Sequence, residues 1–205
     1  MTSSLLLPVS WSKRSSGSVK EMISFFSASL PELIFGSASP FTLDEFDCMA
    51  AEYLDCRKCE VLKALTYPVP EHDPEGFVCV CDLWRKVREF ERFLHLRIAK
   101  IRAAKLEREI NIPEPEGFFS EIDYILNSAM SCDDPGEREL IIDRVRWEYL
   151  DTMTMNHMLD FEGLCIYRLK LQILEAYKGR TSEEGTPRFE QALEMILRAG
   201  RNLEQ

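Results

Sequence analysis

The sequence predicts an all-α protein, or nearly so, built as a long-helix bundle with two small lobes. Apolar residues recur at steps of three and four over long stretches without proline, capping residues mark where these stretches start, and convincing strand patterns are few. The composition, 45% hydrophobic and 29% charged, is that of a folded globular chain. We expect a flexible leader over residues 1–21 and a helical domain over 22–205, divisible into lobes 22–112 and 118–205.

The longest helical stretch is predicted from Asp134 to Gly179. It opens with an N-cap aspartate followed by Pro135, and it closes with a basic last turn before Gly179, which is suited to a C-cap. Its predicted buried stripe is Ile141, Val145, Leu150, Met153, His157, Phe161, Leu164, Leu171 and Leu174. Gly163 costs a helix roughly 1 kcal/mol relative to alanine. Because Asp160 is a possible new cap just upstream, we expect a bend there or two collinear helices.

Two further long helices are predicted earlier in the chain. Thr42 and Glu45 form a capping-box pattern that starts a helix reaching about Leu65. Its predicted apolar face is Phe46, Met49, Ala50, Tyr53, Leu54, Val61 and Leu65. A second helix is predicted from Asp82 to about Ile110. Its predicted buried stripe is Leu83, Val87, Phe90, Leu94, Ile98 and Ile101.

Shorter elements complete the prediction. The apolar stretch from Glu21 to Phe35 fits either a strand or a short buried helix, and length alone does not decide between them. Ser120 starts a short helix that reaches about Met130, and Thr186-Pro187 starts a terminal helix. The terminal helix is predicted to turn Phe189, Leu193, Ile196 and Leu197 inward.

Charge and cysteine usage restrict the class of partner. The formal net charge of −10 disfavours general binding to nucleic acid and to anionic lipid. No apolar run reaches the length of a membrane span, and the first residues lack the pattern of a signal peptide. Seven cysteines, an odd number without an export signal, indicate reduced thiols in a cytoplasmic protein.

The cysteines also offer one metal hypothesis. Cys56 and Cys59, followed by Cys79 and Cys81, could hold zinc through four thiolates. The second pair is separated by one residue rather than two, no glycine-rich knuckle accompanies either pair, and the first pair falls within a predicted helix. Free cysteines, buried or partly buried, are therefore the favoured interpretation.

Histidines and basic residues give no stronger site. None of His72, His95 and His157 follows a glutamate at the spacing of a di-iron bundle, and His157 lies on the apolar stripe, which favours a hydrogen-bonded core histidine. A basic face on the helix that begins at Asp82 could grip a nucleic-acid backbone or an acidic protein, although a solvated or salt-bridged face is favoured. This face comprises Arg85, Arg88, Arg92, His95 and Arg102.

No catalytic residue, cofactor-binding residue or metal ligand is predicted. The chain has no glycine-rich phosphate loop, no Gly-x-Ser-x-Gly elbow and no zinc-protease helix. We therefore expect a protein that is not an enzyme, that needs no cofactor and that has no small-molecule substrate.

Two segments carry a more specific pattern. The first runs from Phe25-Phe26 through Ala28-Ser29-Leu30-Pro31 to Phe35-Gly36, and then to Pro40 and Thr42-x-x-Glu45-Phe46. The second covers Phe161 to Tyr177, with Tyr167-Arg168-Leu169-Lys170-Leu171 at its centre, and continues to Glu183-Glu184-Gly185 and Phe189. Together they resemble the N-terminal and C-terminal signatures of an uncharacterised bacterial family associated with V/A-type ATPase operons.

That family is regarded as a shortened relative of the C (or d) subunit of V-type ATP synthases, an all-helical funnel. The resemblance implies a non-catalytic adaptor that couples the central rotor shaft to the membrane ring in ATP-driven ion transport. It also implies central-stalk and membrane-ring subunits as partners, and a cytoplasmic position peripheral to the inner membrane. An acidic helical chaperone, or a regulatory module that binds another protein, is the alternative.

Overall fold

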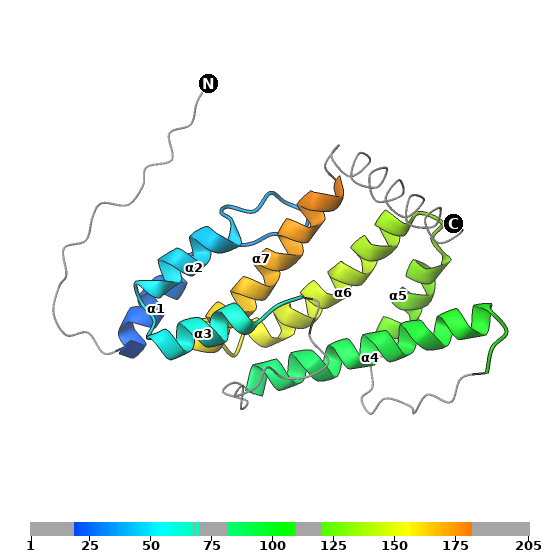
Figure 1. Cartoon of the computed structure of the whole chain (residues 1–205), viewed down its shortest axis with the longest axis horizontal. Coiled ribbons are helices and arrows are strands. Elements are labelled where there is room, and N and C mark those ends of the chain that lie inside the picture. Colours follow the sequence, from blue (N-terminus) through cyan, green and yellow to red (C-terminus); the bar gives the residue numbers. More distant parts are fainter. Residues whose placement is uncertain (1–18, 68, 70–81, 110–119, 182–205) are drawn as a thin grey trace, which may run out of the picture.

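The computed structural model describes residues 19–67, 69, 82–109 and 120–181. Within these residues the chain forms seven α-helices and no strand, which confirms the predicted all-α class (Figure 1). Their order is α1 Val19–Ser29, α2 Leu43–Ala51, α3 Cys56–Ala64, α4 Asp82–Lys105, α5 Ser120–Ser131, α6 Pro135–Thr154 and α7 Phe161–Thr181. None of these helices is long and apolar enough to cross a membrane.

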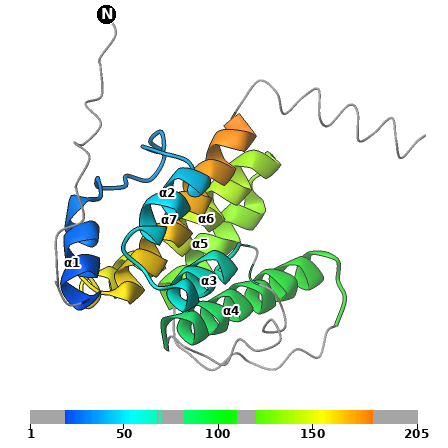
Figure 2. The same ribbon diagram turned by 60° about the vertical axis from the view of Figure 1, so that its left-hand side comes forward.

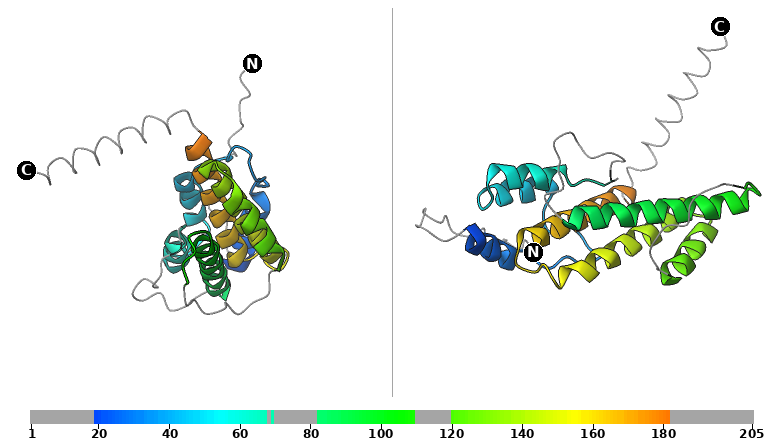
Figure 3. Two further views of the ribbon diagram at one scale, coloured as in Figure 1. Left: turned by 90° about the vertical axis from the view of Figure 1, so that its right-hand side faces the viewer. Right: turned by 90° about the horizontal axis from the view of Figure 1, so that it is seen from below.

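The centre of the fold is an antiparallel hairpin of α6 and α7. Lys170 of α7 reaches Asp151 of α6, and its ammonium lies 5.0 Å from the ring centroid of Trp147, also on α6. The helices α1, α2 and α3 contact α7, whereas α5 contacts α6 and α4. Figure 1 and the right-hand view of Figure 3 show α1, α2 and α3 gathered toward one end of the hairpin and α5 at the other, and Figure 2 shows α1 beside the turn that joins α6 to α7.

The predicted arrangement of the Asp134–Gly179 stretch is wrong. Asp134 caps α6 as expected, because its Oδ1 accepts a hydrogen bond from the Gly136 backbone at 2.9 Å. The chain then reverses direction between Thr154 and Phe161, rather than bending or continuing collinearly. At the far end, α7 continues through Gly179 to Thr181, so Gly179 is not the C-cap.

The stretch from Thr42 to Leu65 forms two helices instead of the single one predicted. The capping box is confirmed: Thr42 Oγ1 accepts from the Glu45 backbone, and Glu45 accepts from the Thr42 backbone at 2.8 Å. The break follows from Asp55, whose side chain accepts from the Lys58 backbone at 2.9 Å and starts α3. Phe46, Ala50, Leu54, Val61 and Leu65 are buried as predicted.

Differences at the remaining helices are smaller. α1 makes the first part of the ambiguous Glu21–Phe35 stretch a helix, which ends at Ser29, and because it begins at Val19 it includes the last three residues of the predicted leader. α4 ends at Lys105, earlier than predicted, where Glu107 adopts a positive φ of 51° and the Arg108 N–H returns to the Ala103 carbonyl. α5 is confirmed, and the predicted terminal helix lies outside the described residues.

Two apolar clusters fill the fold, and α4 and α6 contribute to both. The first cluster joins α1, α2, α3 and α7 to Leu83, Trp84 and Val87 of α4 and to the C-terminal half of α6. The second joins α5 to Phe90, Phe93, Leu94 and Ile98 of α4 and to Ile142 and Val145 of α6. The predicted division into lobes 22–112 and 118–205 stays a prediction.

Candidate functional site

The α6–α7 turn brings three metal-ligating side chains together, and its backbone explains how. Asp160 is the N-cap of α7: its Oδ1 accepts a hydrogen bond from the Gly163 backbone at 2.9 Å. On the other side, the Asn156 and His157 N–H groups return to the Met153 and Thr154 carbonyls, and these 3₁₀-type bonds tighten the end of α6. The turn is therefore fixed by backbone hydrogen bonds at both of its ends.

Gly163 is required where the turn meets α7. A Cβ added at this residue would lie 1.9 Å from the His157 carbonyl oxygen, far inside van der Waals contact. The sequence suggests only that Gly163 weakens a helix. In the structure, the absence of a side chain lets the turn cross the first turn of α7 at close range.

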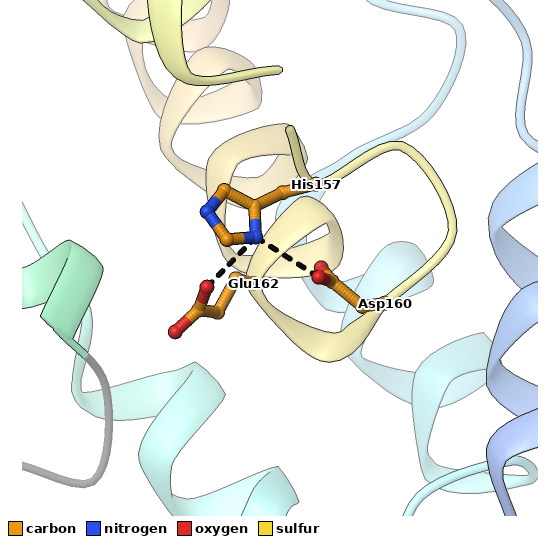
Figure 4. A group of neighbouring side chains, drawn as sticks. All are labelled: His157, Asp160 and Glu162. Atoms are coloured by element: carbon orange, nitrogen blue, oxygen red, sulfur yellow. Dashed lines mark hydrogen bonds and ion pairs between the residues drawn. The ribbon is translucent and has the colours of Figure 1, made fainter. Parts of the chain in front are cut away.

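His157, Asp160 and Glu162 converge at this crossing (Figure 4). His157 Nδ1 lies 2.9 Å from Asp160 Oδ2 and 2.8 Å from Glu162 Oε2. One potential ligand atom from each of the three residues lies within 4.8 Å of the other two. The side chains are 24%, 46% and 27% exposed, so the cluster is half-buried and reachable from solvent.

The predicted core position of His157 is wrong, although its hydrogen bonding is confirmed. The histidine lies in the turn rather than on a helical stripe, because α6 has already ended at Thr154. The sequence signal that could have located this cluster is the spacing His157-x-x-Asp160-x-Glu162 beside a cap and a glycine.

The structure describes only one of the two cysteine pairs in the thiolate hypothesis. Cys56 and Cys59 are free thiols on the first turn of α3. Cys59 is half-buried, within the favoured interpretation, but Cys56 is exposed, which corrects it. Burial, followed by the neighbouring Cys56, raises the pKa of the Cys59 thiol, which disfavours the thiolate that a metal needs. Cys79, Cys81 and His72 lie outside the described residues.

The two segments that carry the family resemblance pack against each other. Phe46 of α2 stacks on Phe26 of α1 and on Tyr167 of α7, with ring centroids 6.0 and 5.4 Å apart. The Tyr167 hydroxyl donates to the Pro31 carbonyl at 2.9 Å, and burial raises the pKa of this phenol. We call Phe26, Phe46, Tyr167 and Pro31 the signature cluster.

A buried ion pair adjoins the signature cluster. Arg168 makes two hydrogen bonds to the Asp47 carboxylate, at 2.8 and 3.0 Å, and a third to the Leu65 carbonyl at 2.5 Å. It thereby ties α7 to α2 and to the end of α3. In the described chain the two signature segments form one packed unit, although about 120 residues of sequence separate Asp47 from Arg168.

The basic face of α4 is mostly exposed, as favoured from the sequence. Arg85 pairs with Asp82 and Glu89 within the helix, and His95 lies 3.9 Å from Glu91. Nearer the C-terminal end, His95, Arg102 and Arg108 border an open depression of about 570 Å³. Its apolar lining is Ile98, Ala99, Ala103 and Leu106.

Exposed apolar side chains gather at the turn end of the hairpin. Met155, Met158 and Leu159 in the turn are 84%, 69% and 51% exposed. Ser24 of α1 donates to the Leu159 carbonyl at 2.9 Å, which places α1 beside the turn. We call Met155, Met158 and Leu159 the turn patch.

No family model, curated protein or solved structure matches this chain in comparisons with known proteins.

Proposed function

We propose that this protein is a non-catalytic adaptor subunit of a V/A-type ATPase, which couples the central rotor shaft to the membrane ring during ATP-driven ion transport. The observation that carries the proposal is the signature cluster with its Arg168–Asp47 pair. The two segments that resemble the signatures of one family pack into one unit. The proposed position is cytoplasmic, peripheral to the inner membrane through the complex, with central-stalk and ring subunits as partners.

The mechanical features of the fold support an adaptor. α4, α6 and α7 comprise 24, 20 and 21 residues, so each spans roughly 30 Å or more at 1.5 Å per residue. The two helices of the hairpin are held together in part by Lys170 of α7, which contacts Asp151 and Trp147 of α6. An element that transmits torque needs long, stiff helices that are held to one another by side-chain contacts.

The chemistry of the buried charges supports a structural rather than a catalytic protein. Glu91, Asp143, Arg168 and Lys170 are the buried charged side chains of the described residues. Each one pairs with an opposite charge: Glu91 and Asp143 with Arg146, Arg168 with Asp47, and Lys170 with Asp151. All of these pairs hold helices to one another or brace a single helix.

The test is affinity purification of the tagged full chain from its native cell in mild detergent, with mass spectrometry of the co-purifying proteins. Shaft and ring subunits in fixed ratio are expected. Recovery of the chain alone, with an intact ATPase elsewhere in the lysate, would contradict the proposal.

Charge-introducing variants at opposite ends of the molecule would locate the contact. Met155→Glu with Met158→Glu alters the turn patch, and Tyr124→Glu alters an 80% exposed side chain on α5. These positions are exposed, so the fold should tolerate all three changes. An adaptor that contacts its partners through the turn patch loses them in the first variant and keeps them in the second.

An acidic chaperone or regulatory module is the second candidate. The net charge of −10 suits a basic client, and exposed methionines provide an adaptable apolar surface. This function predicts a client protein, without ATPase subunits, in the same purification.

A further inference from the structure

The three side chains at the α6–α7 turn have the arrangement of a metal-ligand set. Asp160 and Glu162 each direct one carboxylate oxygen at His157 Nδ1, at 2.9 and 2.8 Å (Figure 4). A tetrahedral zinc ion with ligands at about 2.0–2.1 Å holds its ligand atoms roughly 3.3 Å apart. Each carboxylate oxygen would therefore need to move only about half an ångström away from Nδ1 to admit an ion, and the half-exposed side chains leave an approach from solvent.

The orientation of Asp160 favours ligation. Its Oδ1 is used by the Gly163 backbone N–H, at 2.9 Å, so the carboxylate is held in place while Oδ2 remains on the His157 side. A hydrogen bond that fixes a ligating carboxylate is the usual second layer of a metal site. Gly163 contributes again, because its missing Cβ allows the His157 backbone to approach the first turn of α7.

The charges also match a divalent ion. Two carboxylates converge on a single imidazole nitrogen, and their oxygens lie within 4.8 Å of each other. Like charges at that distance repel, so a positive charge beside both carboxylates, carried by a metal ion or by a protonated imidazole, stabilises the cluster. A divalent ion offsets both carboxylates while histidine stays neutral, which is the protonation state that binds metal.

We propose that His157 Nδ1, Asp160 Oδ2 and Glu162 Oε2 bind a divalent transition-metal ion of the zinc or manganese class, with water completing its coordination. One imidazole with two carboxylates suits these ions better than calcium or magnesium, which prefer all-oxygen sites. The bound ion joins the turn after α6 to the first turn of α7 and so braces the end of the hairpin.

Cobalt(II) is the probe for the first experiment, because its absorption distinguishes ligand types. The full chain, reduced and freed of metal, is titrated with Co²⁺ and followed by visible absorption and by calorimetry. We expect one ion per chain, bound without a thiolate-to-cobalt charge-transfer band. His157→Gln and, separately, Glu162→Gln should each weaken binding by more than about tenfold. Circular dichroism shows whether each variant keeps its helices, and two ligand variants guard against the failure of one to fold.

His95→Gln is the matched control. His95 is the other described histidine beside a carboxylate, but it is 59% exposed and has a single carboxylate at 3.9 Å. Its replacement should leave cobalt binding unchanged. A metal bound at the turn should also raise the thermal midpoint of the wild type with increasing Zn²⁺, and this rise should be absent in His157→Gln.

Three outcomes would overturn the proposal. A thiolate band, or binding that survives both ligand variants, would assign the ion to cysteines. The absence of binding at millimolar Co²⁺ would leave His157 as an ion-pairing side chain only. None of these outcomes bears on recovery of ATPase subunits, so this proposal and the proposed function fail separately.

Discussion

Two arginines anchor the interior of this protein in different ways. Arg168 pairs with one carboxylate, Asp47, and gives its third hydrogen bond to the Leu65 carbonyl. Arg146 pairs with two: it lies 2.8 Å from Glu91 of α4 and 2.9 Å from Asp143 on its own helix. Arg168 therefore contacts a single carboxylate, whereas Arg146 contacts two.

Charge balance separates the roles of the two sites. At Arg146, burial acts to lower the guanidinium pKa, but the hydrogen bonds and charges of Glu91 and Asp143 outweigh it and raise that pKa. Arg146 thus compensates two carboxylates that are 3% and 6% exposed. Arg168 compensates one and also satisfies a carbonyl. Replacing Arg146 should accordingly lower the stability of the fold more than replacing Arg168.

The largest expected effect is that of Arg146→Met. It removes the guanidinium that contacts both buried carboxylates, Glu91 and Asp143, and we expect the free energy of unfolding to fall by about 4–5 kcal/mol. Urea denaturation followed by circular dichroism measures the change. Arg92→Met, at an exposed position on α4 next to Glu91 in the sequence, is the control and should change stability by less than about 0.5 kcal/mol. Equal losses in the two variants would contradict the buried-triad interpretation.

Arg168→Met should cost less, about 3 kcal/mol. It strands a single carboxylate, Asp47, whereas the Leu65 carbonyl keeps a hydrogen bond from Gln172 Nε2 at 2.6 Å. The same denaturation experiment ranks the two arginines. A loss larger than that of Arg146→Met would show that the Arg168–Asp47 pair, rather than the triad, dominates stability.

Double variants sharpen the ranking. Adding Asp47→Leu to Arg168→Met removes the stranded charge and should recover about 2 kcal/mol, because a buried pair replaced by apolar residues is often close to neutral. Adding Asp143→Leu to Arg146→Met should recover less, since the buried Glu91 carboxylate still lacks the Arg146 guanidinium. Similar recovery in both cases would mean that Glu91 reaches water once Arg146 is gone.

Alkaline pH tests the tyrosines beside each arginine. Burial, with the charge of Glu91 second, raises the pKa of Tyr67 near Arg146, and burial raises that of Tyr167 beside Arg168. Because the pKa of each tyrosine is higher in the folded chain, the unfolded chain loses the phenol proton at a lower pH. Stability should be complete below about pH 10 and should fall above it by about 1.4 kcal/mol per pH unit for each tyrosine. Tyr67→Phe and Tyr167→Phe should each make this fall shallower, and an unchanged slope would contradict the assignment.

Local signals in the sequence were sufficient for helix starts. Thr42 with Glu45, and Asp134 with Pro135, act within a few residues, so their caps could be predicted without the fold. The contact of Arg146 with Glu91 and Asp143 could not be predicted in this way, because Glu91 lies 55 residues away in the sequence. Charged residues among apolar ones also resemble a solvated helix face. Only the packing of α4 on α6 brings Glu91 and Arg146 together.

The candidate metal site was hidden by a wrong helix assignment. On a continuous helix His157 and Asp160 share a face, but Glu162, five residues on from His157, points elsewhere. Only the reversal of the chain after Thr154 brings all three to one point. Gly163 and Asp160 marked an interruption, but what decides between a bend and a hairpin is the packing of α7 on α6.

The exposed methionines of the turn give the protein a built-in footprinting reporter. Met155 and Met158 are 84% and 69% exposed, whereas Met130 and Met153 are 5% and 9% exposed. Mild peroxide converts accessible methionine to its sulfoxide, so the turn should be oxidised first and the buried pair should serve as an internal reference. Any partner that covers the turn would slow oxidation there alone, and mass spectrometry would record its footprint without a label.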